Sequence, residues 1–215
     1  MSRIDVASAG YDNERFQPLP PQQIEAFRAE KALPPRFWLF IGTLEPRKNL
    51  TTLLDAYAAL HPDERLPLVL AGAKGWDYAP IFERIERYRL ADAVRLTGFV
   101  PADELPLWYN SAETFVYPSI YEGFGLPVLE AMACGTPVII ASASSLPEVG
   151  GEAALIVPPE DSDAWREALR TAFSSATWRE QASQRGLLQA ARFSWDHTAQ
   201  ATVACYQKAV GDTTT

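Results

Sequence analysis

The chain has 215 residues, a length that fits one large domain or two small ones. Its 47% hydrophobic and 21% charged residues are ordinary for a globular protein. The net charge of −8 argues against a nucleic-acid partner, which would require a basic patch. Two cysteines fit a reducing compartment, and no apolar run approaches the ~18 residues of a membrane span. The first ten residues lack the apolar core of a signal peptide, so we expect a cytoplasmic protein.

Six short apolar runs recur along the chain, and each ends at Gly, Pro or Ser. They consist mainly of Val, Ile, Leu and Phe without polar alternation, which is typical of strands buried on both faces of a sheet. The runs are 37–42, 66–72, 93–98, 113–119, 136–142 and 153–159.

Stretches of helical periodicity separate these runs and follow the last of them. They are 49–60, 77–90, 103–111, 126–134, 146–150, 161–174, 177–191 and 195–210. Strands that alternate with helices form βαβ units and a doubly wound parallel sheet. We therefore predict an α/β fold: a single Rossmann-like sheet of about six strands, followed by C-terminal helices.

The two ends of the chain differ from this alternating middle. Residues 1–22 are interpreted as a linker, because their second half is polar, contains proline and has no period. This linker leads into a helix predicted at 21–32. The domain itself is predicted to span 23–210, and the last residues, 211–215, are predicted to be a disordered tail.

Ligands of open parallel sheets bind outside the carboxyl ends of the strands, where three segments carry candidate residues. The first, GTLEPRKN, begins at Gly42, whose backbone can approach a ligand closely. Arg47 and Lys48 lie beside a helix N-terminus that favours an anion, and Asn49 is a candidate helix cap. This pattern favours a phosphate site. The alternative is a solvated loop in which Arg47 and Lys48 pair with Glu45.

The second segment, YEGFGLPVLE, carries two carboxylates and two glycines. Gly123 and Gly125 free the backbone to present amides, and Pro127 suits a first helical turn. Glu122 precedes the glycines and Glu130 lies about one turn into the helix, so they would contact different parts of one extended ligand. Pairs of sugar or ribose hydroxyls suit such acceptors. The alternative is that Glu122 caps a helix end and Glu130 is a surface acid.

The third segment, TGFVP at 97–101, offers a glycine and exposed apolar side chains that would form a slot for a nucleobase. The alternative for this weak signal is an ordinary turn into a helix. The sequence contains no Ser–His–Asp order, no Walker loop, no zinc-ligand spacing and no GxGxxG string. We therefore predict no metal and no cofactor.

Several of these segments resemble one known family. YPSIYEGFGLPVLEAMACGTPVIIAS resembles the donor-binding half of group 1 retaining glycosyltransferases (family 4, GT-B fold), whose hallmark is two glutamates separated by seven residues. Further similarity lies in FIGTLEPRKNLTTLLDAYAAL, VRLTGFVPADELPLWYNSAETFVYPS and SSLPEVGGEAALIVPPED. ASAGYDNERFQP resembles the interdomain linker of the family, and FSWDHTAQATVACYQKAV its closing helix. The resemblance covers nearly the whole chain, in order.

The resemblance implies a site for a nucleotide sugar. Lys48, with Arg47 beside it, would bind the diphosphate, and Glu130 would hold the ribose hydroxyls. Glu122 is the implied catalytic residue and would contact sugar hydroxyls, although no nucleophile is assigned. The residues implied to bind the donor are Gly42, Thr43, Arg47, Lys48, Phe99, Val100, Glu122, Gly123, Phe124, Gly125, Leu126 and Glu130. The loop amides of this set would cradle sugar and phosphate, and Phe99 and Val100 would line the base pocket.

The resemblance also implies a reaction. We expect transfer of a hexose from a nucleoside-diphosphate sugar to a saccharide or lipid-linked acceptor, without a cofactor. The EPRKN variant is similar to that of bacterial mannosyltransferases and favours GDP-mannose. Many members carry Arg at the position of Thr43, so one phosphate contact is either lost or supplied by Arg47.

Enzymes with the GT-B fold have a second Rossmann-like half that usually supplies the acceptor site. We expect this chain to be the C-terminal part of a longer enzyme, inactive alone, whose whole form lies in the cytoplasm or at the inner face of the membrane. Two alternatives stay open. One is a non-catalytic sugar-nucleotide-binding module that works with a separate chain. The other is a relative with different chemistry, such as an epimerase or a phosphorylase.

Overall fold

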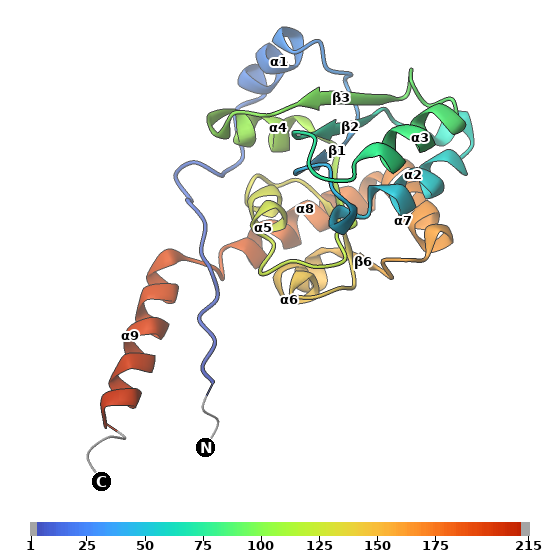
Figure 1. Ribbon diagram of the computed structural model, residues 1–215. Coiled ribbons are helices and arrows are strands. Elements are labelled where there is room, and N and C mark those ends of the chain that lie inside the picture. The colour runs from blue at the N-terminus through green and yellow to red at the C-terminus, as the bar shows by residue number, and fades with distance from the viewer. Residues whose placement is uncertain (1–3, 212–215) are drawn as a thin grey trace.

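Six parallel strands form one sheet in the computed structural model, which describes residues 4–211 (Figure 1). The strand order is β3-β2-β1-β4-β5-β6, which is the order of a Rossmann-like domain. The strands are β1 (Trp38–Ile41), β2 (Leu68–Ala71), β3 (Val94–Gly98), β4 (Thr114–Tyr117), β5 (Val138–Ala141) and β6 (Leu155–Val157). Each lies within one of the predicted apolar runs, so the predicted fold class is confirmed.

Helices cover both faces of this sheet. They are α1 (Pro21–Glu30), α2 (Leu50–Ala58), α3 (Ala79–Arg87), α4 (Leu105–Ser111), α5 (Leu126–Ala133), α6 (Leu146–Gly150), α7 (Ser162–Ser174), α8 (Ala176–Ala190) and α9 (Trp195–Gly211). Short 3-10 turns are η1 (Pro46–Lys48), η2 (Pro62–Glu64), η3 (Ala102–Glu104) and η4 (Gly151–Ala153). Helices α3, α2 and α7 are neighbours on one face, and α4, α5 and α8 on the other (Figure 1).

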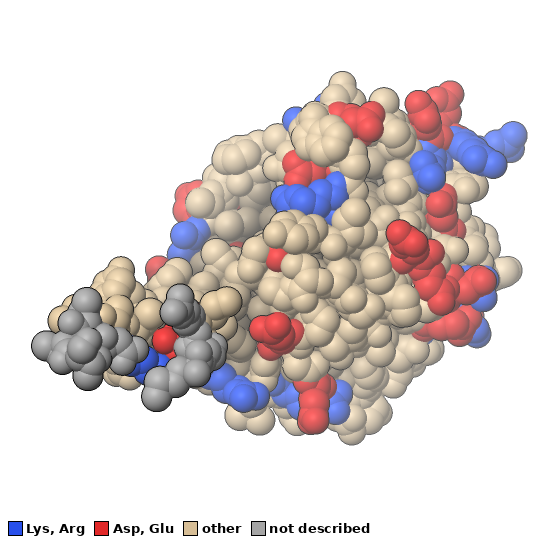
Figure 2. Space-filling model, turned by 60° about the horizontal axis from the view of Figure 1, so that its bottom comes forward, with Lys and Arg blue, Asp and Glu red and all other residues tan. Residues whose placement is uncertain are grey.

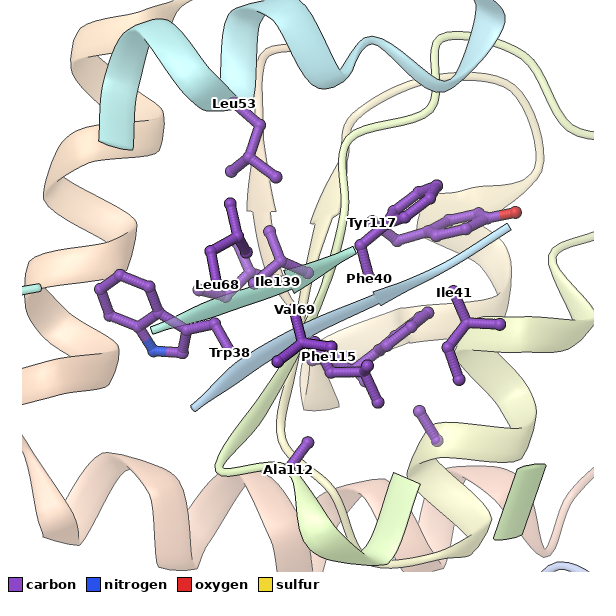
Figure 3. Packing of buried hydrophobic residues seen from close by; sticks show 14 of the residues in the cluster. Trp38, Phe40, Ile41, Leu53, Leu68, Val69, Ala112, Phe115, Tyr117 and Ile139 are labelled. Carbon is purple, nitrogen blue, oxygen red and sulfur yellow. The ribbon is translucent and has the colours of Figure 1, made fainter. Parts of the chain in front are cut away.

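The four central strands are buried along their whole length. In the register of the sheet, Trp38 of β1 lies between Leu68 of β2 and Thr114 of β4. Figure 3 shows these strands carrying large side chains to both faces, with the rings of Phe40 and Tyr117 side by side. Burial of one such side chain stabilises the fold by roughly 1.5–3 kcal/mol. The core therefore fixes the backbone of the central strands on which the site depends.

The expected burial on both faces is wrong for the two outermost strands. In β3, Arg95 and Leu96 are exposed, and in β6, Ile156 is exposed. The strand order explains this exposure, because β3 and β6 lie at the two edges of the sheet and each pairs with one neighbouring strand, whereas a central strand has a neighbour on both sides. Arg95 donates hydrogen bonds of 2.7 Å to the carbonyls of Lys31 and Ala32, which ties β3 to the end of α1.

The N-terminal segment runs beside α9, and both project from the body of the molecule (Figure 1). Thr198 Oγ1 donates to the Ser8 carbonyl over 2.6 Å, and Lys208 pairs with Asp5 at 2.7 Å. Of the predicted tail, 211–215, only Gly211 is described, as the last residue of α9. Among the described residues, no helix combines the length and the apolar character needed to cross a membrane.

Close approach of two loops requires a glycine at position 72. A Cβ added to Gly72 would lie 1.9 Å from the carbonyl oxygen of Gly42, a backbone atom that cannot turn away. We predict that Gly72→Ala lowers the free energy of unfolding by about 1–3 kcal/mol, measured by urea denaturation. Gly123→Ala is the control, because its Cβ would meet no atom within 4 Å. Equal unfolding free energies of Gly72→Ala and Gly123→Ala would contradict the requirement for a glycine at position 72.

Candidate functional site

The first two predicted segments meet at the carboxyl ends of β1 and β4. These strands are neighbours at the point where the strand order reverses, which is where open α/β sheets bind ligands. The Ile120 amide donates to the Arg47 carbonyl over 3.0 Å, and Ser119 Oγ lies 3.1 Å from the same carbonyl oxygen. The loop after β1 and the loop after β4 therefore form one continuous surface.

A buried lysine lies at the centre of this surface. Lys48 is only 6% exposed, and its ammonium donates hydrogen bonds of 2.6 Å to both Tyr117 Oη and Glu122 Oε1. Arg47 pairs with Glu122 Oε2 at 2.9 Å and with Glu45 at 2.7 Å. The alternative of a solvated loop is thus correct only for the Arg47–Glu45 pair, because Lys48 is buried and pairs with Glu122 instead.

Glu122 is the acceptor on which these contacts converge. Besides the two cations, Ser119 Oγ donates to its Oε1 over 2.6 Å and Tyr117 Oη over 3.0 Å. Burial alone would raise the pKa of Glu122, but the Lys48 ammonium and the Ser119 hydroxyl outweigh it and hold the pKa below its ordinary value. Glu122 is therefore an anion at neutral pH. It does not cap α5, whose N-cap is Gly125.

The glycine loop presents free amides beside this carboxylate. Ser145 Oγ, at the start of α6, donates to the carbonyls of Phe124 at 2.7 Å and Glu122 at 3.1 Å, which ties these oxygens back toward the protein. Within the described residues, no hydrogen bond is donated by the amides of Gly123, Phe124, Gly125 and Leu126. Free amides near cationic side chains are features that favour an anionic ligand.

Glu130 lies inside α5 and is not the surface acid of the alternative interpretation. Tyr109 Oη donates to its Oε2 over 3.0 Å. Burial raises the pKa of Glu130 to about 7, although the Tyr109 hydroxyl and the charge of Arg15 act in the opposite direction. A ligand whose hydroxyls donate to this carboxylate would favour its ionised form.

The third segment is joined to the first through the loop after β2, because the Gly72 amide donates to the Gly98 carbonyl over 2.8 Å and Gly72 packs against Gly42. Phe99 is 76% exposed after β3, whereas Val100 packs against the core. In the part of the chain that the structure describes, no hydrogen bond or ion pair joins 97–101 to the Lys48–Glu122 pair. The described residues also contain no group of three or more His, Cys, Asp or Glu side chains that could hold a metal ion.

Asn49 is the N-cap residue of α2, as expected, but its side chain does not cap the helix. Asn49 adopts the left-handed conformation at the end of η1 and makes no capping hydrogen bond with its side chain. Its Nδ2 instead donates to the Pro159 carbonyl over 2.6 Å, and its Oδ1 accepts from Thr52 Oγ1 over 2.7 Å. The 3-10 turn η1 ends at Lys48, two residues before α2 begins, and Asn49 is turned toward the segment before α7.

Sequence reasoning missed four polar residues of the site: Tyr109, Tyr117, Ser119 and Ser145. Each holds a predicted residue through a hydroxyl hydrogen bond. Tyr117 and Ser119 close the apolar run 113–119, so the only available signal was their position at a strand end beside the second segment.

The strand order and the position of the candidate site at the switch point of the sheet define a Rossmann-like α/β domain. Figure 2 shows acidic and basic side chains interspersed on one face of the molecule, without a continuous basic patch. Residues 22–189 match the family model described as "Glycosyl transferases group 1". The chain therefore belongs to the group 1 glycosyltransferases, which confirms the resemblance seen in the sequence.

Individual relatives agree with this assignment. The chain is 46% identical over 171 residues to the O-antigen chain mannosyltransferase B of Escherichia coli, covering 79% of this chain and 45% of that protein. Among solved structures, the match to sucrose-phosphate synthase from Thermosynechococcus elongatus covers 96% of this chain and 52% of the synthase chain, with a TM-score of 0.80 and 28% sequence identity. The C-terminal domain of a group 1 glycosyltransferase (LpcC) from Francisella tularensis matches 85% of this chain and 97% of its own, with a TM-score of 0.73 and 25% identity. The fold is one half of a GT-B enzyme.

The raised pKa of Glu130 predicts a dependence of stability on pH. The carboxyl binds its proton more tightly in the folded chain than in the unfolded one, so stability is greatest below the ordinary value of 4.5 and falls as the pH rises through about 7. Relative to Glu130→Gln, we expect the wild-type protein to lose about 2–3 kcal/mol of unfolding free energy between pH 5 and pH 8. Urea denaturation at both pH values measures this, and parallel losses in the two proteins would contradict it.

Proposed function

We propose that this chain is the donor-binding domain of a retaining glycosyltransferase that transfers a hexose, with mannose favoured, from a nucleoside-diphosphate sugar to a saccharide or lipid-linked acceptor. The observation that carries the proposal is the buried Lys48–Glu122 pair at the switch point of the sheet, where Glu122 directly precedes a loop with free amides. The 46% identity to a protein described as a mannosyltransferase supports the choice of sugar.

Each part of the site suits one part of such a donor. Lys48, Arg47 and the free amides provide positive charge for a diphosphate, and they would stabilise the negative charge that develops when it leaves as product. Glu122 accepts hydroxyls of the sugar, and Glu130 accepts those of the ribose. We propose that Phe99 and Val100 line the pocket for the base. The described residues offer no side chain that we assign as a nucleophile.

The whole enzyme is proposed to be larger than this domain. The chain spans 45% of the length of the Escherichia coli mannosyltransferase that it matches. We propose that the acceptor binds between this domain and a second Rossmann-like half, and that closure of the two excludes water from the donor. On this proposal the domain binds the donor but transfers no sugar alone.

The donor site is tested by nucleotide binding. We predict that Lys48→Ala and Glu130→Ala each weaken binding of the preferred nucleotide among GDP, UDP and ADP by about tenfold or more, because each removes a charged hydrogen-bond partner. Isothermal titration calorimetry measures the affinities. Lys208→Ala is the matched control, because this exposed lysine pairs with Asp5, beside α9, and should leave binding unchanged. Unchanged affinity in both site variants would overturn the assignment.

A further inference from the structure

We propose that Glu122 acts as an internal anion that competes with the diphosphate for Lys48 and Arg47, and so makes the site select a sugar-bearing nucleotide over the free nucleoside diphosphate. The proposal rests on the proposed function and deepens it. It gives Glu122 a second role, in discrimination between the substrate and the nucleotide product.

Each carboxylate oxygen of Glu122 forms an ion pair with one of the two cations, Lys48 and Arg47. Oε1 lies 2.6 Å from Lys48 Nζ, and Oε2 lies 2.9 Å from Arg47 Nη1. The side chains of Lys48 and Glu122 are only 7% and 11% exposed, so water screens their attraction weakly. Glu122 alone balances one of the two positive charges, and Glu45, which pairs with Arg47 at 2.7 Å, balances the other. A phosphate that approaches this surface therefore meets cations that are already paired.

The surrounding residues hold the carboxylate in this position. The hydroxyls of Ser119 and Tyr117 both donate to Oε1, and the Ser144 and Ser145 hydroxyls donate to the Glu122 carbonyl. Burial and the neighbouring Glu122 raise the pKa of Tyr117, so its hydroxyl keeps the proton that it donates. The ion pair is thus a built feature of the site.

Only a ligand that offers hydroxyls can compensate Glu122 for the loss of its cations. A nucleotide sugar supplies phosphate oxygens to Lys48 and Arg47 and sugar hydroxyls to Glu122. A free nucleoside diphosphate supplies phosphate oxygens to the cations and ribose hydroxyls to Glu130, but it brings no sugar hydroxyl to Glu122 and leaves the displaced carboxylate without a new partner. After sugar transfer, Glu122 returns to Lys48 and Arg47 and weakens the hold on the nucleotide product.

The test compares free nucleotide and nucleotide sugar in Glu122→Gln. This variant keeps the shape of the side chain but removes its charge. We expect it to bind GDP about tenfold more tightly than the wild type, and to lose most of its preference for GDP-mannose over GDP. UDP and ADP, each with its matching sugar nucleotide, are titrated in the same way. Glu167→Gln is the matched control, because it removes one negative charge from a carboxylate that, among residues 4–211, forms ion pairs only with arginines of its own helix.

A second variant keeps the test independent of how well Glu122→Gln folds. Ser119→Ala removes a hydroxyl that fixes the carboxylate but contacts neither cation side chain, and we expect about threefold tighter GDP binding. The proposal is overturned if both variants bind GDP as the wild type does or more weakly. If Lys48→Ala loses GDP while Glu122→Gln gains nothing, the donor site stands and only this proposal fails. If no nucleotide binds the wild type or any variant, both fail.

Discussion

The ion pair between Lys48 and Glu122 is the interaction on which the site depends. Taking two charges out of water costs several kcal/mol per ion, and a buried pair of this kind adds little net stability compared with apolar side chains of similar size. Removing one partner, in contrast, leaves an uncompensated buried charge at a cost of about 3–5 kcal/mol. The pair therefore does not explain how the domain folds. It explains why the loops after β1 and β4 must keep a fixed position relative to each other.

Packing in the hydrophobic core fixes this relative position. Tyr117 is the link between the two, since its ring stacks on Phe40 at a centroid distance of 5.8 Å while its hydroxyl contacts both Lys48 and Glu122. Figure 3 shows this hydroxyl oxygen at the carboxyl end of the strands, beyond the packed rings. Gly72 acts in a similar way, because it lets the loop after β2 approach Gly42, the first residue of the segment that carries Arg47 and Lys48. Single residues such as Tyr117 and Gly72 thus connect the packed core to the polar site.

The sequence predicted the sheet well because buried parallel strands and amphipathic helices leave strong periodic patterns. It also placed the two segments that the structure joins, since chain order and the switch-point rule bring strand ends together. It did not identify the partner of Lys48, because pairing with Glu45 or Glu122 depends on how two loops distant in sequence are packed. Nor did it separate edge strands such as β3 from central ones, because an apolar run does not reveal the position of its strand in the sheet.

A double-mutant cycle between Lys48 and Glu122 tests this account most directly. The unfolding free energies of the wild type, Lys48→Met, Glu122→Gln and the double variant are measured by urea denaturation at pH 7. We predict a coupling energy of about 2 kcal/mol or more, with the double variant more stable than the sum of the single effects. A coupling energy below about 0.5 kcal/mol would show that the two charges act independently and would contradict the central role of the pair.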